Sequence, residues 1–198
     1  SSYYRNEVRR KALRESVGSM EDFLAGLEME FTKGAVGPET IARATQLVSK
    51  TNKFNLTTRR HSQSKLQRMV DSDAYDVLWA RLADRYGDSG IIGITVVQYA
   101  DNEAAIDSFL MSCRVMNRRV EQAMLCELIE RAIDRGCTAI TGSYIETIRN
   151  QIVNDFYLKS GFAAADGPEG ARHFRIDLSD RAARPEWPAE LLRVETAR

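Results

Sequence analysis

Three short apolar runs that follow one another without an intervening helix constrain the fold of this chain most strongly. They span 74–83, 91–99 and 105–113. The separators 87–90 (GDSG) and 100–103 (ADNE) consist of turn-forming residues. Short apolar runs joined by such turns are typical of neighbouring antiparallel strands, so this region is predicted to be a three-stranded meander.

The apolar spacing changes after the meander. Residues 118–135 carry Val120, Met124 and Leu128 on one helical face, and Gly136 ends that pattern. The other predicted elements are helices at 6–17, 19–27, 38–49, 62–71 and 150–160, and strands at 28–32, 139–144 and 172–178. This order predicts an α+β protein with a mixed, mainly antiparallel sheet flanked by helices.

The chain of 198 residues divides into three segments. Residues 1–18 form a basic lead-in helix that we expect to follow an upstream region missing from the sequence. Residues 19–178 form one domain, which can bury roughly 70% of its unfolded surface without a disulfide or metal. Residues 179–198 contain Pro185 and Pro188 and are expected to be a loosely attached tail.

Composition excludes several classes of function. Lys plus Arg and Asp plus Glu are both 28, so no excess of positive charge favours nucleic-acid binding. Three cysteines without CxxC spacing and only two histidines argue against disulfides and against a metal site. No apolar run spans a membrane and the polar N-terminus is no signal peptide. A cytoplasmic protein is predicted.

The segment 150–162, NQIVNDFYLKSGF, resembles the pattern N-x-x-A/V-x-x-F-Y-x-K-x-G-F of GNAT acyltransferases. Four further stretches are similar to the C-terminal half of FkbH-like proteins: QLVSKTNKFNLTTRR (46–60), DRYGDSGIIG (84–93), IDSFLMSCRV (106–115) and GSYIETIRN (142–150). The FkbH-like resemblance covers roughly residues 3–178 and implies a GNAT-like fold.

The FkbH-like resemblance also implies an activity. Such proteins join a HAD-type phosphatase half to a GNAT-like half and load a glyceryl unit from 1,3-bisphosphoglycerate onto an acyl carrier protein. The HAD signature Asp-x-Asp-x-Thr is missing here, so the phosphatase domain would be a separate partner. The expected partner is an acyl carrier protein whose phosphopantetheine arm is the acceptor, and no cofactor of the chain's own is expected.

Cys113 is the candidate nucleophile. It follows a predicted strand, precedes a predicted helix and neighbours Arg114, a setting that favours thiolate. From the residues alone, a free cysteine is more often a small apolar core residue. The FkbH-like resemblance reverses this preference and implies an acyl-enzyme on Cys113. Core packing is predicted for Cys126 and Cys137.

The residues after Cys113 depart from the GNAT pattern. The pattern Q/R-x-x-G-x-G/A, whose backbone amides hold the pyrophosphate of acetyl-CoA, aligns with 114–119, and Asn117 and Arg119 fill its glycine positions. Asn tolerates the left-handed conformation, whereas Arg119 adds bulk and charge. We therefore expect poor binding of CoA. Arg118 fits an exposed position on a solvated helix.

The polar loop 50–59 is the candidate substrate site. Asn52, Asn55 and Thr57 offer donors and acceptors for a hydroxylated acid, and Lys50 and Arg59 suit a phosphate. An ordinary capped loop explains the same residues equally well. The FkbH-like resemblance implies that this loop lines the acyl pocket.

Four further residues complete the candidate site. Tyr157 occupies the general-acid position of the GNAT pattern, although core-edge tyrosines are common. Thr147 and Asn150 are candidates to orient a pantetheine amide, and Asn150 fits a helix cap equally well. His61 is the candidate base, against the alternative of a histidine without a special role.

Two other functions remain open. A CoA-dependent GNAT N-acetyltransferase would need an intact pyrophosphate loop. A non-catalytic GNAT-like module would only dock a carrier protein, and Cys113 would then be dispensable. Basic stretches such as 9–11 and 59–60 are plausible docking surfaces for an acidic carrier protein.

Overall fold

The computed structural model describes residues 2–195, and within them nine strands form one sheet. The strands are β1 (Met29–Ala35), β2 (Phe54–Asn55), β3 (Tyr75–Asp84), β4 (Gly87–Ala100), β5 (Glu103–Met111), β6 (Ala139–Tyr144), β7 (Ala163–Ala165), β8 (Arg172–Asp177) and β9 (Leu191–Val194). The order is β7-β8-β6-β5-β4-β3-β1-β9, with β2 paired to β5. Only the β5–β6 and β1–β9 pairs among these described strands are parallel. The predicted fold class and meander are confirmed.

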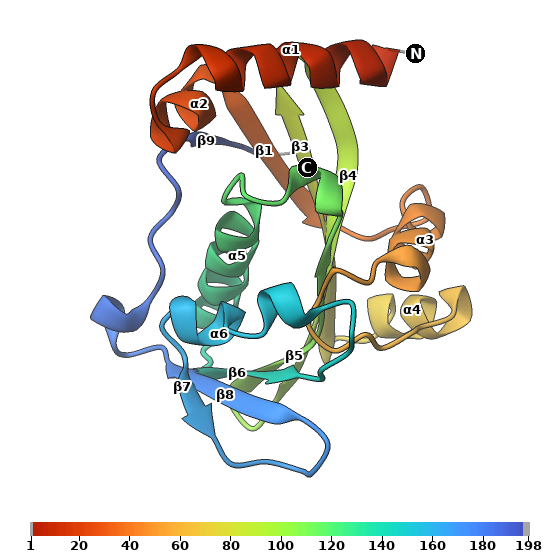
Figure 1. Cartoon of the computed structure of the whole chain (residues 1–198). Helices are drawn as coiled ribbons and strands as arrows, with labels where there is room; N and C mark the ends of the chain where they lie inside the picture. Colours follow the sequence, from red (N-terminus) through yellow and green to blue (C-terminus); the bar gives the residue numbers. More distant parts are fainter. Residues whose placement is uncertain (1, 196–198) are drawn as a thin grey trace.

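Helices cover both faces of the sheet (Figure 1). They are α1 (Ser2–Ser16), α2 (Met20–Gly26), α3 (Ile41–Lys50), α4 (Gln63–Val70), α5 (Val120–Asp134) and α6 (Phe156–Lys159), with 3-10 turns η1 (Cys113–Val115), η2 (Gln151–Val153) and η3 (Arg181–Ala183). Helices α3 and α4 lie on one face, and α5 and α6 lie on the other. Each face has its own apolar cluster: Ile94 and Leu110 belong to the α3 side, whereas Phe109 and Met111 belong to the α5 side.

The predicted helix at 150–160 is wrong in detail. The chain instead forms the turn η2 and the four-residue helix α6. Asn150, Asn154 and Asp155 explain the interruption, because Asn and Asp side chains compete with the helical backbone for hydrogen bonds.

Residues 179–195 of the predicted tail are not loosely attached, and 196–198 lie outside the described residues. Strand β9 pairs in parallel with β1, and Leu191 is buried. Trp187 packs edge-on against Phe31, and its indole N–H donates to the carbonyl of Leu191 at 2.7 Å. These contacts attach the end of the chain to the sheet.

The predicted basic helix at the N-terminus is observed as α1. Arg10 makes a bidentate contact with Asp84, which is at the end of β3, with bonds of 2.7 and 2.9 Å. Arg118 also reaches Asp84 at 3.3 Å and is buried. The prediction that Arg118 is solvated is therefore wrong, because its charge is neutralised by a residue distant in sequence.

Candidate functional site

Strands β5 and β6 separate after a short parallel contact. Their register runs from the pair Glu103 and Ala139 to the pair Ile106 and Gly142, and β5 then continues to Met111 without β6. At the same point β5 has a bulge, because Val96 faces Ser108 while Val97 faces Ile106. A gap between two sheet strands exposes backbone groups, and these must find other partners.

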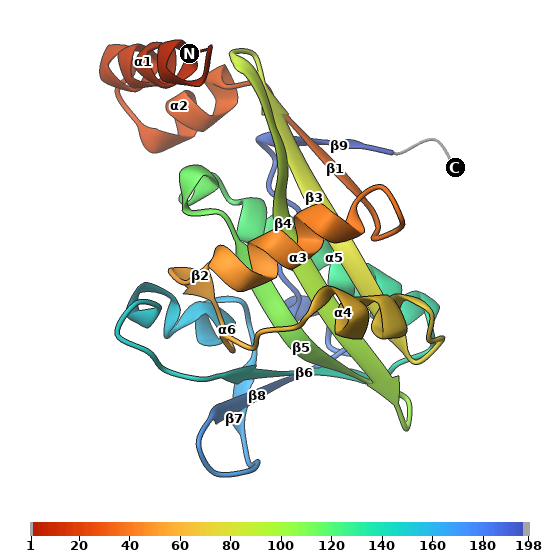
Figure 2. The ribbon, with the colours of Figure 1, turned by 90° about the vertical axis from the view of Figure 1, so that its right-hand side faces the viewer.

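The segment 54–57 occupies this gap (Figure 2). Phe54 and Asn55 pair with the end of β5, and the N–H of Leu56 donates to Phe109 at 3.1 Å. On the opposite side, the carbonyl of Leu56 accepts a bond of 2.8 Å from Ile145, just beyond β6. The segment therefore connects the two separated strands.

Asn150 holds this arrangement. It is fully buried, and its amide nitrogen donates to the carbonyls of Asn55 and Ile145, both at 2.9 Å. Its amide oxygen accepts from the N–H of Thr147 at 2.8 Å and from the hydroxyl of Tyr144 at 3.1 Å. The side chain predicted to orient a pantetheine amide is thus committed to the protein's own backbone.

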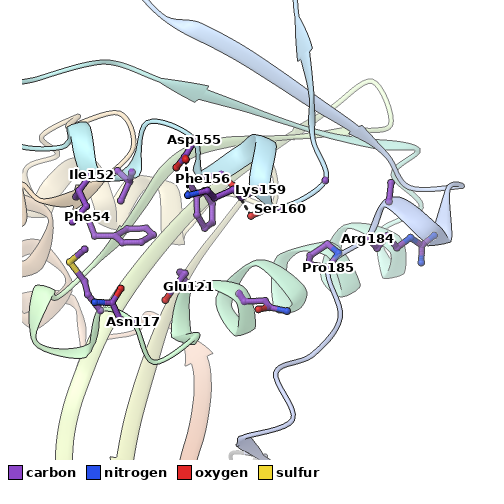
Figure 3. A pocket seen from close by; sticks show the side chains of 15 residues that line it. Phe54, Asn117, Glu121, Ile152, Asp155, Phe156, Lys159, Ser160, Arg184 and Pro185 are labelled. Atoms are coloured by element: carbon purple, nitrogen blue, oxygen red, sulfur yellow. Dashed lines mark hydrogen bonds and ion pairs between the residues drawn. The ribbon is translucent and has the colours of Figure 1, made fainter. Parts of the chain in front are cut away.

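A cavity of about 500 Å³, here called the α5–α6 pocket, opens on the α5 side of the segment 54–57 (Figure 3). Phe54 lines one wall, and Asn117 and Glu121 lie at the start of α5. Lys159 and Arg184 supply positive charge from α6 and from the segment after η3. Lys159 also pairs with Asp155 at 2.7 Å.

The loop before α5 keeps a left-handed backbone at both positions where the GNAT pattern has glycine. The φ angle is 63° at Asn117 and 60° at Arg119. Arg119 does not line the pocket, because its guanidinium pairs with Glu190 at 3.1 Å and with Glu21 at 3.5 Å. The side chain of Arg119 therefore leaves open the pocket at the N-terminus of α5, where helical N–H groups favour an anion.

Glu121 adds a carboxylate to the α5–α6 pocket. One of its oxygens is buried without a hydrogen-bond partner among the described residues. Burial raises the pKa of Glu121, whereas its own backbone N–H and Arg119 lower it by less. An anionic ligand in this pocket would therefore repel the charged form of Glu121.

A second cavity, here called the Cys113 pocket, has a volume of about 630 Å³ and lies where α3 ends. It is lined by Leu47, Lys50, Thr51, Asn52, Lys53, Ser112, Cys113, Ile148 and Arg149. The structure thus brings Cys113 together with two predicted loop residues, Lys50 and Asn52. Lys53 lines this pocket, and the next residue, Phe54, lines the α5–α6 pocket.

Cys113 is exposed. Met111 is buried two residues earlier, and side-chain alternation along a strand would bury Cys113 as well. Strand β5 ends at Met111, however, and Cys113 opens the turn η1. It does not adjoin the first turn of α5, which begins at Val120. Arg114 is exposed beside it, and its side chain bonds to Ser112 at 3.2 Å.

The remaining loop residues are not in the Cys113 pocket. Asn55 and Thr57 are buried, and Thr57 donates to the carbonyl of Asp107 at 2.9 Å. Arg59 pairs with the carboxylate of Asp107 at 2.8 Å. His61 is buried, and its Nε2 lies 2.6 Å from the same carboxylate. Burial alone would raise the pKa of Asp107, but bonds from His61 and Ser108 hold it below its ordinary value.

Tyr157 lies under the point where β5 and β6 separate. Its ring stacks on Phe174 and leaves no room for a side chain at Gly142. The residue is buried, its hydroxyl has no hydrogen-bond partner among the described residues, and burial raises its pKa. Its role as a general acid stays a prediction, since the hydroxyl is buried and Tyr157 lines neither pocket.

No group of three metal-ligating side chains occurs within the described part of the chain. No helix in that part is long and apolar enough to cross a membrane. Sequence reasoning missed Lys53, Arg149 and Phe54 as pocket residues. The signal available for Lys53 and Phe54 was their position inside the polar loop, but Arg149 carries no local signal.

Comparisons with known proteins identify the fold. The PaiA N-acetyltransferase of Thermoplasma acidophilum, solved with coenzyme A, is 14% identical with a TM-score of 0.61 and matches 75% of this chain and 99% of that one. The ribosomal-protein-S18-alanine N-acetyltransferase of Escherichia coli is also 14% identical, with a TM-score of 0.56, over 75% and 94%. N-acetylglutamate synthase of Neisseria gonorrhoeae, complexed with coenzyme A and N-acetyl-glutamate, is 11% identical with a TM-score of 0.56, over 75% and 35%.

These likenesses show that the chain has the GNAT fold. No family model matches the sequence, and no curated protein matches it. The expectation that the chain uses no cofactor is contradicted, because two of these GNAT-fold structures hold coenzyme A. The obstacle inferred at Arg119 is also wrong, because Glu190 and Glu21 hold its side chain outside the pocket.

Proposed function

We propose that this chain is a CoA-dependent acyltransferase that acetylates an amine. The observation that carries the proposal is the left-handed backbone at Asn117 and Arg119, at the N-terminus of α5, beside a pocket that Arg119 leaves open. The GNAT-fold neighbours named as N-acetyltransferases support the same activity.

The residues of the α5–α6 pocket fit coenzyme A. The first-turn N–H groups of α5 and the side chains of Lys159 and Arg184 would hold its phosphates, and Phe54 would contact its apolar arm. The volume of about 500 Å³ is within the usual range for small-molecule sites. When bound, acetyl-CoA supplies a thioester carbonyl that an amine can attack with release of the thiol. The acceptor would approach through the Cys113 pocket, so Phe54 has to shift during transfer.

Titration calorimetry with CoA tests this proposal. A β-branched residue strongly disfavours positive φ, so Asn117→Val should deform the loop and weaken CoA binding by about tenfold or more. Asn102→Val is the matched control, because Asn102 also has a φ of 60° but lies in the β4–β5 turn, outside the α5–α6 pocket. Wild-type protein that binds no CoA, or equal losses in both variants, would contradict the proposal.

A second candidate is the glyceryl transfer implied by the FkbH-like resemblance, in which Cys113 takes an acyl group from an acyl phosphate and passes it to an acyl carrier protein. Its supporting observation is that exposed Cys113 shares a pocket with Lys50 and Asn52. Intact-protein mass spectrometry after incubation with an acyl phosphate tests it. An adduct absent from Cys113→Ala would favour this candidate over the first.

A further inference from the structure

The charged residues that line the Cys113 pocket are all cations. They are Lys50, Lys53 and Arg149, and no carboxylate lines the cavity. None of the three has an ion pair among the described residues. The chain has 28 acidic residues for 28 basic ones, so this one-sided charge reflects a local arrangement.

Two more guanidinium groups bond to polar residues of the same cavity wall. Arg60 donates to the side-chain oxygen of Asn52, and Arg114 contacts the hydroxyl of Ser112 at 3.2 Å. Neither Arg60 nor Arg114 has an ion pair among the residues that the structure describes. Arg60 also donates to the carbonyls of Val48 and Thr51, and Arg114 lies over the ring of Tyr3, so the partners of both groups are neutral.

Arg114 also repels a second guanidinium group, that of Arg43. Burial lowers the pKa of Arg43 on α3, and the positive charge of Arg114 lowers it further. Lys50 alone would not indicate an anion site, since the helix dipole favours a cation at the last turn of α3. Lys53 and Arg149 lie outside helices and have no such explanation. An anion in the pocket would offset the charge of the three cations that line it.

We infer that the Cys113 pocket binds the acyl acceptor of the proposed reaction through a phosphate or carboxylate group, so that the substrate is an anionic amine. The volume of about 630 Å³ suits a small molecule. Guanidinium and ammonium groups are the side chains that bind phosphate and carboxylate most strongly. A purely cationic amine would be repelled. That the bound anion is the acyl acceptor rests on the proposed function, whereas the binding of an anion in this pocket does not.

Protection of Cys113 from alkylation measures occupancy of this pocket without CoA. The protein is treated with iodoacetamide, which is uncharged, in increasing concentrations of O-phosphoethanolamine, inorganic phosphate, β-alanine or ethanolamine. Modification of each cysteine is followed by peptide mass spectrometry. Partly exposed Cys137, which does not line this pocket, serves as an internal reference in the same sample.

We expect saturable protection of Cys113 by O-phosphoethanolamine and by phosphate or β-alanine, and none by ethanolamine. The double variant Lys53→Ala, Arg149→Ala should raise the apparent Kd by roughly tenfold or more, because it removes two charged contacts. Lys65→Ala, which removes an exposed lysine on α4, should leave the Kd unchanged. Equal protection by ethanolamine, or an unchanged Kd in the double variant, would overturn the inference.

The same probes separate this inference from the proposed function. If phosphate protects Cys113 from alkylation but no acetyl transfer is detected, the anion site is supported and the N-acetyltransferase activity is contradicted. If ethanolamine and O-phosphoethanolamine are acetylated at equal kcat/KM, the N-acetyltransferase activity is supported and the preference for an anionic acceptor is contradicted.

Discussion

The side-chain amide of Asn150 donates a hydrogen bond of 2.9 Å to the backbone carbonyl of Asn55, 95 residues earlier in the chain. This bond fixes the segment 54–57 in the gap that opens between β5 and β6. The segment 54–57, whose Phe54 lines the α5–α6 pocket, is therefore held by a single buried side chain and a few strand bonds.

Asn150→Ala should destabilise the protein by about 2–4 kcal/mol, because the buried carbonyls of Asn55 and Ile145 would lose their donors. Urea denaturation measures the loss. Asn154→Ala is the control, since Asn154 is exposed and should change stability by less than about 0.5 kcal/mol. Equal midpoints for the two variants would show that the four bonds of Asn150 contribute little.

The three thiols should differ in reactivity. Cys113 is exposed, whereas burial raises the pKa of Cys126 to about 11 and also raises the pKa of Cys137. At pH 7.5 less than roughly one in a thousand Cys126 side chains would be thiolate, the reactive form. Alkylation followed over time should modify Cys113 first and Cys126 last. Modification of all three at one rate would contradict the observed burial.

Glu121 should make CoA binding depend on pH. Burial already raises the pKa of Glu121, and a bound phosphate would raise it further by repulsion. A group whose pKa is higher in the complex favours binding at low pH, so affinity should fall as pH rises from the free to the bound pKa. Glu121→Gln should strengthen binding above that window and flatten the pH dependence.

Calorimetry at several pH values tests this expectation about Glu121. The matched control is Glu39→Gln, because Glu39 is exposed and lies outside the α5–α6 pocket. Weaker CoA binding in Glu121→Gln would mean that this carboxylate accepts a hydrogen bond from the ligand instead of repelling it.

Tyr157→Phe separates packing from chemistry. The hydroxyl has no partner among the described residues, so its removal should leave stability unchanged or raise it by up to about 1 kcal/mol. If the hydroxyl acts as a general acid once substrates displace the segment 54–57, kcat should fall by about 10²–10⁴-fold. A variant that is equally stable and equally active would remove Tyr157 from the mechanism.

The sheet was predictable where its signals are local. Residues 74–113 show strand runs and turns, and the predicted helix at 118–135 is observed at Val120–Asp134. The two-residue strand β2 and the strand β9 were not predictable, because each exists only through pairing with a distant strand. Local spacing cannot report such partners.

In the candidate site, too, features with local sequence signals were predictable, and features that depend on distant residues were not. Lys50 and Asn52 line one cavity with Cys113, whereas the other predicted loop residues do not, and the roles that the family resemblance implies for them stay predictions. The orientation of Arg119 was not predictable, since it depends on Glu190, which is 71 residues away in a segment expected to be loose. The charge of a residue is visible in a sequence, whereas the partner that neutralises it is not.

Acetyl transfer itself tests the central claim most directly. Wild-type protein is mixed with acetyl-CoA and a panel of primary amines that includes O-phosphoethanolamine and ethanolamine, and the released CoA thiol is measured with a chromogenic disulfide. The proposal predicts thiol release that depends on enzyme and amine and is fastest with the anionic amine. Absence of thiol release with every amine, together with an acyl adduct on Cys113 from an acyl phosphate, would contradict it.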